Sequence, residues 1–177
     1  MKKNIVLLGH GGQGVLFAGK ILAHAAAIAG YQSSYIPSSS SPVHNSNVKA
    51  EIIISDEEIF SPFIEKADYT IVFHKFRLDE AKNLSNENTK LFFKDFNAKT
   101  ELKNFVVDTE KSLDKNKSAI TSNIIMLGAL ITNLSDNINI DDKSISEALK
   151  QELIHKPFSL VNQNFKAYKQ GKELFIS

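Results

Sequence analysis

The sequence contains no cysteine and no tryptophan. Without cysteine, this chain can form no disulfide framework, supply no nucleophilic thiol and hold no cysteine-ligated iron–sulfur cluster. The sequence also lacks an excess of either charge, because its 21 Lys and Arg residues nearly balance its 20 Asp and Glu residues and leave a formal net charge of +1. Composition therefore gives no argument for nucleic acid or an anionic membrane as a partner.

A long apolar run is a third absence. No stretch approaches the roughly 20 residues that span a bilayer. The short apolar run near the N-terminus is interrupted by glycines, so it does not fit a signal peptide. We therefore expect a cytoplasmic protein with no membrane partner. The 177 residues, 42% of them hydrophobic, fit one globular domain spanning residues 1–177.

What is present is a glycine-rich turn between two apolar segments. Residues 5–8 (IVLL) predict a buried strand, and residues 15–25 predict a helix. Gly9, Gly11 and Gly14 between them fit the G-x-G-x-x-G spacing. Such a turn needs glycine for positive φ, and the amides that open the next helix suit a phosphate. The candidate phosphate-binding residues are Gly9, Gly11, Gly12, Gln13 and Gly14.

The turn alone leaves two interpretations open. The glycines can serve a ligand, or they can simply let the strand turn sharply and pack on its helix. A dinucleotide site would also place an acidic residue about 20 residues further on, at the end of the second strand. Residues 31–37 (YQSSYIP) contain no Asp or Glu, so NAD binding is disfavoured.

A polar loop is predicted at residues 37–47, where serine, asparagine and proline favour local turns. In an open α/β sheet, loops beyond the carboxyl ends of neighbouring strands share one crevice. We therefore expect this loop near the glycine turn, with Ser39, Ser40, Ser41 and His44 as further ligand candidates. A solvated loop with no ligand is the alternative.

The hydrophobic pattern predicts a Rossmann-like α/β domain of three layers, with a mostly parallel sheet and flanking helices. Strands are expected at 3–8, 31–36, 48–55, 69–74, 90–93 and 105–108, with short additional strands at 59–60 and 174–176. Helices are expected at 13–29, 77–84 and 120–134, after Ser61, from Ser144 and from Phe158 to about Gly171. The partly polar strand 48–55 suits an exposed or antiparallel position. His74 and Lys75 follow a buried strand and can face the same crevice as the glycine turn.

The helix at 120–134 is apolar nearly all round, which places it in the core or at a subunit interface. Gly128 inside it costs helix stability, on the order of 1 kcal/mol relative to alanine. Close approach of another backbone would explain that glycine.

The sequence shows no catalytic constellation. It has no nucleophile–base pair, no Cys/His spacing for a metal and no lysine of the P-loop type. We therefore predict no catalytic residue and no metal ligand in this chain.

Several segments together resemble the gamma subunit of 2-oxoacid:ferredoxin oxidoreductases, the family of the pyruvate, 2-oxoglutarate, 2-oxoisovalerate and indolepyruvate enzymes. Residues 11–15 (GGQGV) and Ala18-Gly19 look like its glycine turn and first helix. Residues 54–57 (ISDE), 123–130 (NIIMLGAL) and 164–171 (NFKAYKQG) look like its later motifs. The resemblance spans nearly the whole chain.

One loop departs from the family pattern. Family members commonly carry Arg-Gly-Gly where this chain has His44-Asn45-Ser46. Arginine offers a permanently charged planar fork to an anion, whereas histidine offers at most a partial charge near neutral pH. Whether this loop keeps the family's ligand contact stays open.

The resemblance implies an accessory subunit of a complex that converts a 2-oxoacid and coenzyme A into acyl-CoA, CO₂ and reduced ferredoxin. Thiamine diphosphate, Mg and iron–sulfur clusters would reside in partner alpha, beta and ferredoxin-like delta subunits. This chain would assist assembly and handle coenzyme A, and would be inactive when isolated, where a homodimer is open to it. The alternatives are a free-standing nucleotide-binding protein and a gamma-like structural module without a ligand site.

Overall fold

The structure, a computed structural model, describes residues 1–40, 46–109, 118–134 and 138–176. Its sheet contains β1 (Lys2–His10), β2 (Gln32–Ser39), β3 (Asn47–Ser55), β4 (Tyr69–Val72), β5 (Lys90–Lys94) and β6 (Asn104–Val107). The strand order is β2-β3-β1-β4-β5-β6. Only β3 runs against the others, because it pairs antiparallel with both β1 and β2, whereas β1, β4, β5 and β6 pair in parallel.

The position of β3 makes the sheet mixed. β1, α1 (Val15–Ile28) and β2 follow one another in the sequence, and the two strands run in the same direction. β3 then returns along the sheet and lies between β1 and β2. The register pairs His10 with Asn47, so the carboxyl end of β1 lies beside the start of β3. This confirms a mostly parallel sheet and an antiparallel β3. Of the two positions predicted for β3, exposed or antiparallel, the structure shows the antiparallel one, and Ile52, Ile53 and Ile54 are fully buried.

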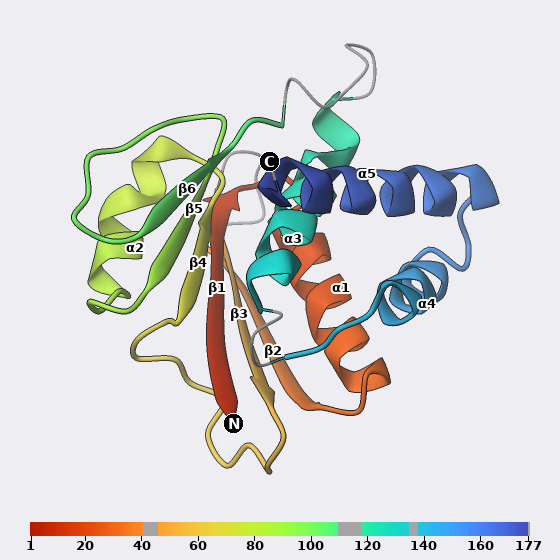
Figure 1. Cartoon of the computed structure of the whole chain (residues 1–177), viewed down its shortest axis with the longest axis horizontal. Helices are drawn as coiled ribbons and strands as arrows, with labels where there is room; N and C mark the ends of the chain where they lie inside the picture. Colours follow the sequence, from red (N-terminus) through yellow and green to blue (C-terminus); the bar gives the residue numbers. More distant parts are fainter. Residues whose placement is uncertain (41–45, 110–117, 135–137, 177) are drawn as a thin grey trace.

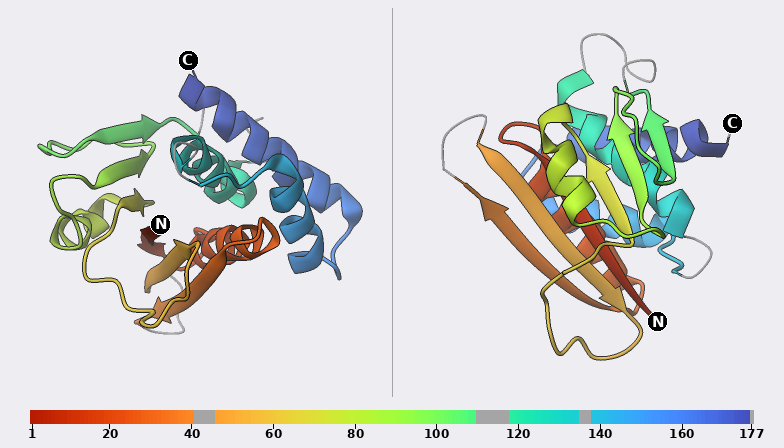
Figure 2. Two further views of the ribbon diagram at one scale, coloured as in Figure 1. Left: turned by 60° about the horizontal axis from the view of Figure 1, so that its bottom comes forward. Right: turned by 90° about the vertical axis from the view of Figure 1, so that its left-hand side faces the viewer.

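Helices cover the sheet in two layers (Figures 1 and 2). On one face lie α1, α3 (Ser118–Leu134), α4 (Asp142–Glu152) and α5 (Phe158–Ile176), and on the other lie η1 (Lys75–Arg77) and α2 (Leu78–Asn83). Ile5 and Leu7 of β1 enter the larger core, while Val6 and Leu8 enter the smaller one. A strand buried on both faces needs an unbroken apolar run, which explains the IVLL segment.

Two glycines set the contact between α3 and α5. A Cβ on Gly128 would collide with the carbonyl oxygen of Tyr168, and one on Gly171 would collide with the carbonyl oxygen of Ile125. The predicted close approach at Gly128 is therefore made by α5 of the same chain, and α3 is a core helix, as Figure 1 shows.

Gly171 does not end the last helix. α5 continues to Ile176, so the strand expected at 174–176 was wrong. A glycine in the middle of a helix looks like a stop signal in sequence, but here its missing side chain makes room for α3.

Two other local predictions also fail. Residues 57–68 contain neither the strand at 59–60 nor the helix after Ser61. The helix predicted from Ser144 begins earlier, at Asp142, because the Asp141 carboxylate accepts a hydrogen bond from the Ser144 backbone amide at 2.8 Å and caps it. Ile145, Ala148 and Leu149 form its buried face.

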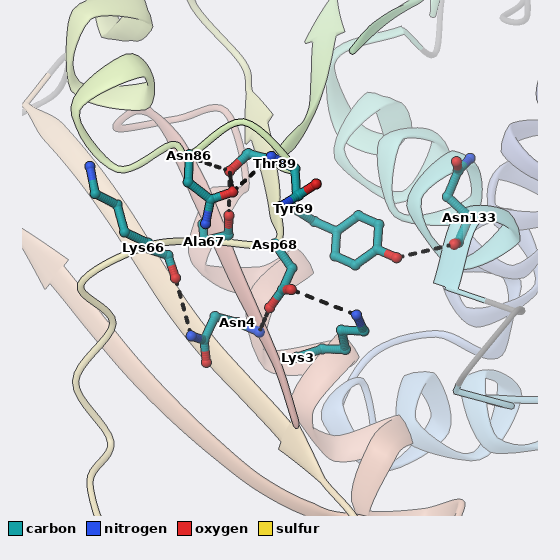
Figure 3. Close-up of polar contacts among 10 residues, drawn as sticks. Lys3, Asn4, Lys66, Ala67, Asp68, Tyr69, Asn86, Thr89 and Asn133 are labelled. Atoms are coloured by element: carbon teal, nitrogen blue, oxygen red, sulfur yellow. Dashed lines mark hydrogen bonds and ion pairs between the residues drawn. The ribbon is translucent and has the colours of Figure 1, made fainter. Parts of the chain in front are cut away.

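Polar contacts at the amino ends of β4 and β5 are structural (Figure 3). The Asp68 carboxylate accepts from the Asn4 backbone amide at 2.7 Å and ties β1 to β4. The Thr89 hydroxyl donates to the Ala67 carbonyl at 2.6 Å, and the Tyr69 hydroxyl donates to the Asn133 carbonyl at 3.3 Å. Within the described ranges, these contacts lie at the opposite end of the sheet from the glycine turn.

Candidate functional site

The glycine turn joins β1 to α1 as the sequence predicts. Gly12 and Gly14 have φ angles of 92° and 70°, values that favour glycine. Gly14 is the N-cap of α1, but it offers no side chain as a cap, and the first turn of α1 contains no acidic residue. The amides that open α1 therefore retain their attraction for an anion.

Gln13 holds the turn together. Its Oε1 accepts from the His10 backbone amide at 2.8 Å, and its Nε2 donates to the Phe73 carbonyl at 3.3 Å. A Cβ on Gly9 would lie 2.7 Å from the same Oε1. Gln13 thus fixes the turn to the ends of β1 and β4, and its predicted contact with a ligand stays a prediction.

The end of the β2–β3 hairpin lies against the turn, where the sequence placed the polar loop. The Gly11 amide donates to the Ser46 carbonyl at 2.9 Å. Ser39 contacts the Ser46 hydroxyl at 3.0 Å, and the Ser40 hydroxyl accepts from the Asn47 amide at 3.1 Å. These two serines close the hairpin. The other two candidates, Ser41 and His44, lie outside the described residues.

A pocket of about 360 Å³ opens on the turn. Its lining includes Gly11, Gly12, Gly14, His10, Phe17 and Val48. Three predicted glycines therefore meet at one cavity. Phe17 and Val48 were not predicted, because their sequence pattern is that of ordinary helix and strand residues.

A second pocket of about 350 Å³ shares Gly12, Gly14 and Phe17 with the first. Asn123 of α3 and Asn164 of α5 also line it, together with Leu160 of α5 and Leu153, the residue that follows α4. Asn123 donates through Nδ2 to the Gly14 carbonyl at 3.0 Å. The turn thus lies between two pockets and is held from the helix layer as well as from the sheet.

Imidazole and amine groups gather at the carboxyl ends of β1 and β4. The rings of His10 and His74 meet edge to face at 4.5 Å, and the Phe76 ring lies 4.9 Å from that of His74. Burial lowers the pKa of His74, and the nearby His10, Lys75 and Lys94 lower it further. The sequence placed His74 and Lys75 here but gave no sign of His10, because only the fold brings residue 10 next to residue 74.

The described residues contain no group of three or more His, Cys, Asp or Glu side chains arranged to hold a metal ion. Across the same ranges, no helix is long and apolar enough to cross a membrane. The chemistry that the geometry offers is binding: peptide amides for an anion, with apolar and amide side chains beside them.

Comparisons with known proteins agree with this arrangement. The family model of pyruvate ferredoxin/flavodoxin oxidoreductases matches residues 4–174. The chain is 28% identical to the 2-oxoglutarate synthase subunit KorC of Methanothermobacter marburgensis, covering 99% of this chain and 98% of that protein.

Solved structures share the fold. The gamma subunit of a keto/oxoacid ferredoxin oxidoreductase from Geobacter sulfurreducens has a TM-score of 0.77 at 23% identity, with 98% of both chains covered. The 2-oxoglutarate:ferredoxin oxidoreductase of Magnetococcus marinus, with 2-oxoglutarate, coenzyme A and succinyl-CoA bound, has a TM-score of 0.85 at 21% identity. That match covers 99% of this chain but 31% of the Magnetococcus chain.

The fold is that of an α/β domain with a six-stranded mixed sheet and a glycine turn that opens α1 beside two pockets. The chain belongs to the pyruvate ferredoxin/flavodoxin oxidoreductase family. Within it the chain is a gamma-type subunit of a 2-oxoacid:ferredoxin oxidoreductase, which confirms the prediction from sequence.

Proposed function

We propose that this gamma-type subunit handles coenzyme A through its glycine turn, while the thiamine-dependent chemistry takes place in partner subunits. The partners are alpha, beta and ferredoxin-like delta chains, which hold thiamine diphosphate, Mg and the iron–sulfur clusters and pass electrons to ferredoxin. The single domain of residues 1–177 acts in the cytoplasm, and catalysis of the oxoacid reaction requires the complex.

The observation that carries this proposal is the uncapped N-terminus of α1 above a pocket of about 360 Å³. Coenzyme A bears phosphates, and peptide amides at a helix N-terminus bind phosphate without needing a fixed positive charge. The chain lacks the family's Arg-Gly-Gly, so the amides of the turn supply most of the attraction. Ser39 and Ser40 lie at the end of the hairpin beside the turn and would add polar contacts, and Ser41 and His44 remain candidates from the sequence.

The two alternatives make different predictions. A free-standing nucleotide-binding protein would bind NAD, FAD or a nucleotide saturably as the isolated chain. A structural module without a ligand site would bind its partner subunits equally well with or without coenzyme A, and Gly12→Val would change nothing.

The test begins with native purification of the chain from its own cells and mass spectrometry of the proteins that stay bound. We expect thiamine-dependent and cysteine-rich chains. Titration calorimetry then compares coenzyme A binding by the wild-type complex and a Gly12→Val complex, for which we expect at least about tenfold weaker binding because the valine side chain enters the turn.

Gly30→Val is the matched control. Gly30 has a φ of 93°, close to that of Gly12, but it follows the other end of α1 and has no atom within 4 Å of the added Cβ. It therefore carries similar backbone strain away from the pocket and should bind coenzyme A as the wild type does. Recovery of the chain alone, or equal binding by the Gly12→Val complex, would reject the proposal.

A further inference from the structure

An aromatic ring stands in solvent beside the glycine turn, at the carboxyl end of β4. β1 and β4 pair in parallel, so their carboxyl ends share one edge of the sheet. There the rings of His10 and His74 have their centres 4.5 Å apart, and the Phe76 ring lies 4.9 Å from that of His74. Phe76 is 76% exposed. The edge of the sheet that carries the turn therefore also carries an open apolar group.

This chain gains little from a phenylalanine at position 76. An aromatic side chain stabilises a fold chiefly by removing its large apolar area from water, and neither of the two cores includes Phe76. The local fold uses other groups, because His74 caps η1 through its ring and Arg77 turns inward to 4% exposure. The Phe76 ring is thus available to another surface.

The surroundings of Phe76 are positively charged. Arg77 and Lys94 each pair with a carboxylate at 2.6 Å. Lys75, whose Nζ lies 5.6 Å from the centre of the Phe76 ring, has no carboxylate partner among the residues that the structure describes. Burial, and then the basic groups around it, lower the pKa of His74. A complementary surface therefore has an apolar hollow for the ring and a carboxylate for Lys75.

The proposed function indicates which partner meets this edge. Coenzyme A held on the glycine turn must bring its thiol to the thiamine site, which lies in another chain. Reacting atoms must approach to about 3–3.5 Å, so the thiamine-binding subunit must lie within reach of a ligand anchored at the turn. The nearest large apolar group on that edge is Phe76, two ring contacts away from the turn through His74 and His10.

We propose that residues 74–76 form a docking surface for the thiamine-binding partner subunit, with the Phe76 ring in an apolar hollow of that subunit and Lys75 beside a carboxylate at the rim. The inference rests on the proposed function, because it takes the coenzyme A site to be at the turn. Phe76 does not contact the ligand in this arrangement, so its loss weakens assembly and leaves the affinity of the assembled complex for coenzyme A unchanged.

The first test places the photoreactive residue p-benzoylphenylalanine at position 76 of the chain in its own cells. After irradiation and denaturing purification, mass spectrometry identifies the crosslinked chain, which we expect to be the thiamine-binding subunit. Position 87 is the matched control. Glu87 is also exposed, but it precedes β5 at the opposite end of the sheet, and a photoreactive residue there should give no crosslink to that subunit.

The second test dilutes purified complexes and follows their dissociation by mass photometry. Phe76→Ser should raise the dissociation constant about five- to tenfold, the effect of losing one interface anchor. Lys75→Glu should weaken the complex more at low salt than at high salt, because salt screens the charges at a rim. Lys82→Glu makes the same charge reversal at an exposed position of α2 and should dissociate as the wild type does.

The outcomes separate this inference from the proposed function. A crosslink from position 76 to a different chain or to none, or wild-type dissociation of both Phe76→Ser and Lys75→Glu, overturns the docking surface. Either result leaves the coenzyme A proposal intact, since calorimetry tests that proposal separately. A wild-type complex that binds no coenzyme A overturns the proposed function and this inference with it.

Discussion

Glycine at position 14 is required by two separate constraints. Its φ of 70° is left-handed, and a Cβ would collide with the Asn123 side chain that binds its carbonyl. The sequence spacing predicted the first constraint. The second links residues 109 positions apart and follows no local pattern, so Asn123 could not be assigned to the turn in advance.

Gly14→Ala should therefore destabilise the chain more than Gly30→Ala. Gly30→Ala adds only left-handed strain, about 1 kcal/mol, since nothing lies within 4 Å of the added atom. Gly14→Ala adds the displacement of Asn123 and should cost about 2–3 kcal/mol. Urea unfolding of the two variants measures the difference. An equal loss of unfolding free energy in both would show that the Asn123 side chain moves aside without a measurable penalty.

Tyr168 makes stability depend on alkaline pH. The side chain is fully buried, and its hydroxyl donates to Asp142 at 3.0 Å. Burial raises the pKa of the Tyr168 phenol far above its ordinary value, and the Asp142 carboxylate raises it further. In the unfolded chain the phenol ionises near pH 10. Above that pH the unfolded state releases the phenol proton while the folded state keeps it. The free energy of unfolding therefore falls as the pH rises beyond about 10.

Tyr168→Phe removes this dependence. Above about pH 10, the wild type should lose up to about 1.4 kcal/mol of stability per pH unit more than the variant does. At pH 8 the variant should be less stable by about 1 kcal/mol, the contribution of one hydrogen bond. Denaturant unfolding from pH 8 to 11 tests both, and parallel curves would contradict the assignment.

At the scale of elements, periodicity predicted most helices and strands and missed what depends on their neighbours. The apolar run 5–8, the helix after it and the apolar helix at 120–134 were all confirmed. The insertion of β3 between β1 and β2 was not foreseeable, because strand order is decided by long-range pairing. Asp141 was missed as a cap because Ser144 fits the same local signal.

The crossing of α3 and α5 leaves no room for a side chain at Gly128 or Gly171. Gly128→Ala should gain about 1 kcal/mol of helix propensity but force the two helices apart, for a net loss of about 1–3 kcal/mol. Urea unfolding followed by circular dichroism checks this. Lys166→Ala, at an exposed position of α5, is the control and should stay within about 0.5 kcal/mol of the wild type. A stabilised Gly128→Ala chain would contradict the close packing.

For the molecule as a whole, several large apolar side chains face solvent. Phe60 and Phe63 are 89% and 76% exposed in the segment that leads from β3 to β4, and Phe76 is 76% exposed. Exposed aromatic groups of this kind commonly mark contacts with other proteins, and membership of this family supplies a reason for such contacts.

Replacing Phe60 and Phe63 together by serine should leave the free energy of unfolding within about 1 kcal/mol of the wild type, because neither side chain is buried. Smaller amounts of the partner subunits should copurify with the double variant than with the wild type in native purification. Replacing the exposed Glu57 and Glu58 by serine controls for a general effect of changing this segment. Full recovery by the phenylalanine variant would show that its partners bind elsewhere.

The place of β2 in the sheet bears on self-association. β2 is the terminal strand of the order, so one side of its backbone has no strand partner within the described sheet. An open edge of this kind can template pairing with a second chain. Pro37 offers no amide for such pairing and is confined to edges of this kind, and the small polar Ser38 and Ser39 follow it at the end of the strand. The sheet is therefore poorly suited to extension by another copy, and aggregation of unassembled chains through this edge is suppressed.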